Sequence, residues 1–137
     1  MGYSTFGGLR VKEKKTLDLS SVSTISTAGV VTYTAAQFLG GLILRDPNGA
    51  GRSDVSPTAA LLIAAMQNAG GPAIVGSSFE FTLRNTADAA ETITMTAGTG
   101  VTLSGTMTIA QNNSKRFLVV VTAVTTVTMY SLGTVVH

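Results

Sequence analysis

The sequence contains no cysteine, no tryptophan and a single histidine, His137. Without cysteine the chain has no disulfide, no thiolate metal ligand and no thiol nucleophile. A Ser-His-Asp mechanism needs a histidine that neighbouring groups hold in one orientation. A lone terminal histidine is not expected to be held in that way. The sequence therefore indicates no catalytic residue and no cofactor, and we expect a protein that is not an enzyme.

Charge is also scarce, because charged residues make up 12% of the 137 residues, about half the share usual in soluble domains. The mean hydropathy is +0.37, yet no apolar run approaches the roughly 18 residues that span a bilayer. The first residues do not show the basic and apolar regions of a signal peptide. Chains of this kind usually cover part of their surface with other chains. We expect an oligomer or a component of a larger assembly, with no membrane partner.

The net charge is only +2, which is too small an imbalance to indicate a nucleic-acid partner. The basic residues are concentrated near the start, where Arg10, Lys12, Lys14 and Lys15 surround Glu13. A glycine pair precedes them and a run rich in serine and threonine follows. Residues 1–25 therefore read as an extended N-terminal arm, and its basic part is suited to an acidic surface. Residues 26–137 read as the folded domain.

The stretch from Ser77 to Leu132 consists of short segments in which β-branched or apolar residues alternate with hydroxyl residues. Glycine, asparagine or aspartate separates the segments, which is typical of strands joined by tight turns. The expected strands cover 77–84, 92–96, 101–104, 106–109, 117–124 and 127–130, with a further one at 30–34. The sequence predicts a mainly β protein, a single jelly-roll-like β-sandwich.

One helix is expected, at about Pro57 to Asn68, where alanine, leucine and isoleucine dominate. Ser56 is placed to cap it, and Pro57 suits the first helical position because no amide donor is needed there. Residues 35–39 have the composition for one further helical turn before Gly40-Gly41. The helix at 57–68 is apolar nearly all round, so we expect it to pack against a sheet and a second partner.

The best metal candidate is the loop that contains Asp46, Asn48, Gly51 and Asp54. It places oxygen ligands and a glycine as a calcium-binding EF-hand loop does, but Pro57 stands where a bidentate glutamate is required. An ordinary turn explains the same residues. Asp88 and Glu91 are close in sequence, but nothing opposes them across a cleft as a paired-carboxylate mechanism requires. We expect no metal site.

Several runs resemble small structural proteins of tailed bacteriophages, in particular the head decoration proteins, also called cement proteins. These runs are NTADAAETIT at 85–94, GTGVTLSGT at 98–106, NNSKRF at 112–117, YSLG at 130–133, RDPNGAGR at 45–52 and PTAA at 57–60. The runs are turn and strand signatures, and none of them contains catalytic residues.

The resemblance implies a β-rich homotrimer that sits on the outer surface of a phage head, binds the major capsid protein and is assembled in the host cytoplasm. The arm would then contact the capsid, and an apolar helix face with the segment before it would join the three copies. The expected capsid-contacting residues are Leu9, Arg10, Val11, Lys12, Lys14 and Lys15. The expected trimer-interface residues are Phe38, Leu39, Leu42, Leu62 and Met66.

Two other functions fit the same composition. A tail, neck or fibre component would also be rich in β-strands, but should form elongated trimers. A carbohydrate-binding β-sandwich would need exposed aromatic residues or a complete calcium loop. The chain has only three tyrosines, Tyr3, Tyr33 and Tyr130, which gives the second alternative little support.

Overall fold

The computed structural model describes residues 5–6, 8–9, 21–70 and 73–137. A short antiparallel pair, β1 (Thr5–Phe6) with β2 (Gly8–Leu9), precedes the folded domain in the sequence. The elements of the domain are β3 (Ser21–Ile25), α1 (Ala35–Leu39), β4 (Gly41–Arg45), β5 (Arg52–Val55), α2 (Ala59–Asn68), β6 (Ser78–Asn85), β7 (Ile93–Thr96), β8 (Val101–Ser104), β9 (Thr108–Ile109), β10 (Asn113–Ala123) and β11 (Thr126–Val136).

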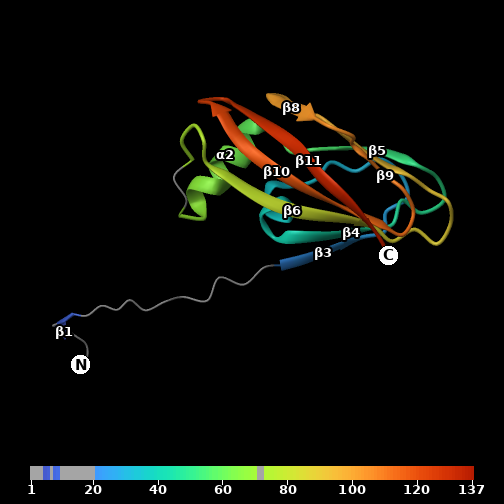
Figure 1. Ribbon diagram of the computed structural model, residues 1–137, viewed down its shortest axis with the longest axis horizontal. Coiled ribbons are helices and arrows are strands. Elements are labelled where there is room, and N and C mark those ends of the chain that lie inside the picture. Colours follow the sequence, from blue (N-terminus) through green and yellow to red (C-terminus); the bar gives the residue numbers. More distant parts are fainter. Residues whose placement is uncertain (1–4, 7, 10–20, 71–72) are drawn as a thin grey trace.

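The domain contains two sheets (Figure 1). The larger is six-stranded in the order β3-β4-β6-β10-β11-β8, and the smaller is three-stranded in the order β5-β7-β9. The long strands β10 and β11 pair antiparallel, and β6 pairs antiparallel with β10 on the other side. Towards the edges the pairing is parallel, between β3 and β4, β4 and β6, and β8 and β11.

The core lies between the two sheets and is closed by the helices. The ring centroid of Phe81 on β6 lies 3.9 Å from that of Phe38 on α1 and 5.1 Å from that of Phe117 on β10. Ile93, Met95 and Ile109 of the smaller sheet are fully buried in the same cluster. The expected β-sandwich is therefore confirmed. Its parallel pairs distinguish its strand order from that of an antiparallel jelly roll.

The structure contains the two expected helical segments, but α2 begins later than predicted. Thr58 caps α2, because its hydroxyl accepts a hydrogen bond from the amide of Leu61 at 3.2 Å. Ser56 is not the cap: its hydroxyl donates to the carbonyl of Pro57 and accepts from the amide of Gly98, both at 2.9 Å. The short helix α1 has a complete capping box, formed by Thr34 and Gln37.

Three other segments differ from the sequence predictions. β3 falls inside the predicted arm, but it pairs with β4 and belongs to the larger sheet. β5 falls in a predicted loop and pairs with β7. The predicted strand at 30–34 is reduced to a single bridge between Thr32 and Val55. Each difference reflects a non-local pairing that local residue preferences do not encode.

Candidate functional site

The largest fully buried side chain in the described part of the chain is that of Arg45, at the end of β4. Its guanidinium uses all five N–H donors of an arginine. Nε and Nη2 donate to the carboxylate of Asp54 at 2.8 and 3.3 Å. The other three N–H groups donate to the carbonyl oxygens of Thr27, Gly29 and Asp46. A buried charge is tolerated only when it is paired and hydrogen-bonded in this way.

Asp54 on β5 is equally saturated. Oδ1 accepts from the amide of Val31 at 3.0 Å and from Arg45, and Oδ2 accepts from the hydroxyl of Tyr33 at 2.8 Å and from Arg45. Burial, together with the charge of Asp54 and its hydrogen bond, raises the pKa of Tyr33 well above its usual value. Burial alone would lower the pKa of Arg45, but the hydrogen bond and charge of Asp54 raise it overall.

This cluster of Arg45, Asp54 and Tyr33 joins the two sheets, since β4 belongs to the larger and β5 to the smaller. It also fixes the connection at 27–33 through the main-chain groups of Thr27, Gly29 and Val31. Each carboxylate oxygen of Asp54 already accepts two hydrogen bonds, which leaves it no free position for a metal ion or a substrate. The arrangement is therefore a structural crosslink.

A second buried polar group holds the loop after β6. Nδ2 of Asn85 donates to the carbonyls of Glu91 and Ile109 at 2.8 and 3.0 Å, and Oδ1 accepts from the amide of Ala87. Oε2 of Glu91 accepts from the amide of Gly49 at 2.9 Å, whereas Oε1 is buried without a partner. These contacts connect the loop after β6 with β9 and with the turn at Gly49.

The structure agrees with the interpretation as a turn for residues 46–51, whereas residues 52–54 belong to β5. Oδ1 of Asp46 accepts from the amide of Asn48 at 2.9 Å, which closes a tight turn, and Asn48 has a positive φ of 55°. Asp54 points into the buried cluster. Among the described residues no group of three or more His, Cys, Asp or Glu side chains is placed to hold a metal ion. Nor does any helix of that part of the chain have the length and apolarity to cross a membrane.

The most distinctive surface is the outer face of the six-stranded sheet, defined as the side opposite the core. Phe81 and Leu83 of β6 face the core, so Glu80, Thr82 and Arg84 face outward. Apart from three charged residues, this face carries apolar and hydroxyl side chains. The apolar ones are Val22, Leu42, Leu44, Leu118, Val120, Tyr130, Leu132 and Val135. Glu80 and Arg116 form an exposed ion pair at 3.2 Å.

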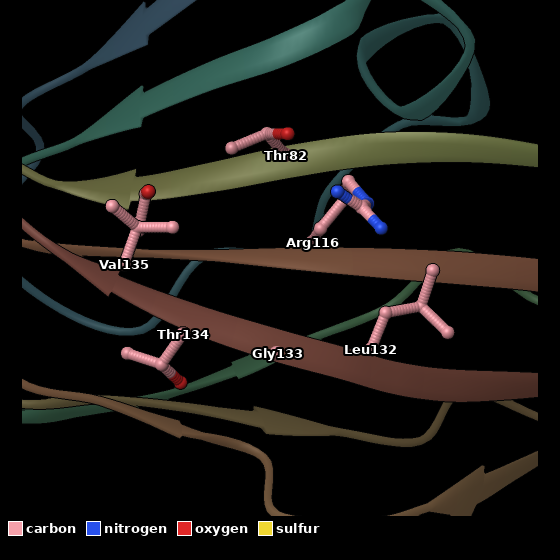
Figure 2. A pocket seen from close by; sticks show the side chains of 7 residues that line it. Thr82, Arg116, Leu132, Gly133, Thr134 and Val135 are labelled. Atoms are coloured by element: carbon pink, nitrogen blue, oxygen red, sulfur yellow. The ribbon is translucent and has the colours of Figure 1, made fainter.

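A hollow of about 270 Å³ lies on this face, where a bulge interrupts the pairing of β10 and β11. Arg116 pairs with Gly133 and Phe117 with Ser131, so Leu132 is the extra residue. Figure 2 shows Arg116, Leu132 and Val135 around Gly133, with Thr82 of β6 on the far side. Beyond the C-terminal end of β11, the ring Nε2 of His137 lies 2.8 Å from Oγ of Ser114.

The predicted trimer residues occupy different environments. Phe38, Leu62 and Met66 were predicted to lie between chains, but they are core residues of the single chain, with exposures of 0%, 1% and 7%. Leu39 and Leu42 are half-buried, so they retain surface for a contact. Of the predicted capsid-contacting residues, Leu9 is in β2, and Arg10, Val11, Lys12, Lys14 and Lys15 lie outside the described residues.

Neither the buried cluster nor the hollow was predicted from the sequence. The signal for the cluster was an arginine directly after the apolar run Leu42-Ile43-Leu44, and the signal for the hollow was a glycine inside the last strand. In comparisons with known proteins, no family model, no curated protein and no solved structure matches this chain.

Proposed function

We propose that this chain is a structural virion protein, a decoration protein that binds the outer surface of an icosahedral phage head. It acts as a homotrimer, its partner is the major capsid protein, and it is assembled in the host cytoplasm. The proposal extends the resemblance carried by the turn and strand signatures at 45–60 and 85–133. The β-sandwich that the chain forms is compatible with it.

The observation that supports it best is the outer face of the six-stranded sheet. A sheet face exposed to water usually carries polar and charged side chains in alternation with the buried ones. Here Tyr130, Leu132 and Val135 are 39%, 42% and 59% exposed, and Glu80 and Arg116 form an ion pair between them. Exposed apolar side chains gathered on one sheet face support a site of protein interaction.

Stabilisation of the head would follow from mass action. A protein that binds only the expanded lattice stabilises that lattice by its binding free energy. Three linked copies add avidity, since the second and third contacts form at a high effective concentration. No chemical step is required for this function, and the fully buried ion pair of Arg45 and Asp54 is saturated by internal hydrogen bonds.

The experiment is negative-stain imaging of virions made with and without this chain. Uniform knobs over the head that disappear with the chain are the expected result. Density confined to the tail would contradict the proposal and favour a tail, neck or fibre component. Light scattering during size-exclusion chromatography should give the mass of three chains.

The arm is tested separately by deletion of residues 1–15. If the basic residues of the arm contact an acidic shell, the truncated protein should occupy fewer sites on the head, and the loss should grow with salt. Unchanged occupancy would exclude an anchoring role for the arm and would leave the folded domain as the binding part.

A further inference from the structure

The glycine at position 133 is not required by the fold. Its φ is outside the positive range that favours glycine. A Cβ built on it would meet no heavy atom within 4 Å, so packing inside the chain does not require glycine either. The bulge does not require it, because the extra residue is Leu132. Glycine weakens a strand interior and often marks a place where another molecule approaches closely.

The hollow above Gly133 has the size and lining for one side chain. Its volume of about 270 Å³ is below the range of typical small-molecule pockets. Leu132 and Val135 give it apolar walls, while Thr82 and Arg116 supply a hydroxyl and a guanidinium on the opposite side (Figure 2). An apolar side chain would fill the hollow, and a neighbouring carboxylate would lie near Arg116.

The charges around the hollow favour an acidic partner. The outer face carries Arg84 and Arg116 but only one acidic residue, Glu80. Nε of Arg84 is buried and has no hydrogen-bond partner within the described structure. Two copies of this face could exchange the Glu80–Arg116 pair, but Arg84 of each copy would still lack an acidic partner, whereas an acidic segment supplies one. A second copy of this chain is therefore the less favourable occupant.

We propose that the outer face of the six-stranded sheet, centred on the hollow above Gly133, docks an extended acidic segment of the shell protein. The segment inserts one apolar side chain over Gly133 and places a carboxylate at Arg116. This inference rests on the proposed function and adds to it the surface that meets the head. Glycine at 133 leaves room for that side chain.

The first test fills the hollow from within, with the full-length variants Gly133→Ala, Gly133→Val and Gly133→Leu. A β-branched residue suits a strand, so the thermal midpoint of Gly133→Val should be unchanged or higher. Its affinity for purified heads assembled without this chain should fall roughly tenfold or more, with Ala intermediate. Thr108→Leu, on the exposed side of the smaller sheet, is the control and should bind as the wild type does.

The second test addresses the carboxylate. Arg116→Gln should weaken binding and reduce its dependence on salt. Glu80→Gln removes the internal competitor for Arg116 and should leave binding equal or stronger. A contact between two copies of this face would give the opposite result, because Glu80 of one copy would then pair with Arg116 of the other.

Three outcomes would overturn the inference. Wild-type binding by Gly133→Val would overturn the docking site but leave the proposed function intact. A change in oligomeric state with Gly133→Val would assign the face to contacts between copies. Failure of the wild-type chain to bind heads at all would remove both the proposed function and the inference that rests on it.

Discussion

Nε of Arg45 lies 2.8 Å from Oδ2 of Asp54, and both side chains are completely excluded from solvent. The pair connects β4 of the larger sheet with β5 of the smaller one. Because every donor and acceptor of the pair is used, its energetic role depends on the main chain that surrounds it as well as on the two charges.

Removal of either charge should destabilise the protein strongly. Arg45→Met and Asp54→Leu each leave a buried, unpaired charge, for which we expect a loss of about 3–5 kcal/mol in the free energy of unfolding. The double variant removes both charges, but the carbonyls of Thr27 and Gly29 and the amide of Val31 lose their partners.

The double variant should therefore lose less than the sum of the two single variants, yet remain at least about 2 kcal/mol less stable than the wild type, since each orphaned buried group has a cost. Urea unfolding of the four proteins measures the coupling. A double variant as stable as the wild type would show that the main-chain contacts of the cluster contribute nothing.

The Tyr33 hydroxyl should make the protein less stable in alkali. Its pKa is raised in the folded state from the ordinary value of 10.0. Above that value the unfolded chain releases the tyrosine proton while the native protein retains it. Above pH 10 the free energy of unfolding then falls by about 1.4 kcal/mol per pH unit, whereas below pH 10 Tyr33 does not contribute to the pH dependence.

Tyr33→Phe should remove this contribution. At neutral pH it should destabilise the protein by about 1–2 kcal/mol, because Asp54 loses one donor, and the difference from the wild type should shrink as the pH rises above about 10. Unfolding midpoints in urea at a series of pH values measure the two slopes. Parallel slopes for the two proteins would contradict the predicted role of Tyr33.

The sequence predicted the β-sandwich well because its strands alternate clearly. In β6 the residues Phe81 and Leu83 face the core, and Glu80, Thr82 and Arg84 do not, as a period of two requires. The parallel pairing of β3 with β4 could not be predicted from the residue pattern, because β3 is the hydroxyl-rich run Ser21–Ile25 with no apolar face of its own. The position of β3 in the sheet is set by its pairing with β4, from which it is separated in the sequence by α1.

The burial of polar residues in the core could not be predicted from the sequence pattern either. Asp54 stood in a run of loop residues and was interpreted as part of a turn, and Lys115 directly follows the polar run Gln111–Ser114. Lys115 is 4% exposed, with its Nζ donating to the carbonyl of Thr106 at 2.9 Å, and burial lowers its pKa. Buried charges depend on partners that only the folded structure brings together.

Asn85 should tolerate substitution poorly because its side chain satisfies three main-chain groups. Asn85→Ala removes those bonds and should cost about 2–4 kcal/mol. Asn85→Asp replaces two donated bonds by a carboxylate that faces the carbonyls of Glu91 and Ile109, and it should cost more at neutral pH.

The two Asn85 variants should also differ in their response to acid. The buried carboxyl of Asn85→Asp will have a raised pKa, so its protonated form is favoured in the native state. That variant should regain stability relative to Asn85→Ala as the pH falls towards about 4. Urea midpoints at neutral and acidic pH provide the measurement, and an unchanged difference between the variants would refute the assignment of Nδ2 as donor.

Gly98 provides the last prediction, by contrast with Gly133. A Cβ at position 98 would lie 2.6 Å from the carbonyl oxygen of Ser56 and 2.8 Å from that of Pro57, both of which are main-chain atoms. The strand β5, the start of α2 and the turn at Gly98 meet at this point, where the amide of Gly98 also donates a hydrogen bond to Oγ of Ser56.

Gly98→Ala must displace that backbone, so we expect a loss of about 2 kcal/mol or more in the free energy of unfolding. Gly133→Ala, which meets no atom within 4 Å, should stay within about 0.5 kcal/mol of the wild type. Thermal and urea unfolding of the two variants compare them directly, and equal stability would show that the close approach at Gly98 does not constrain the fold.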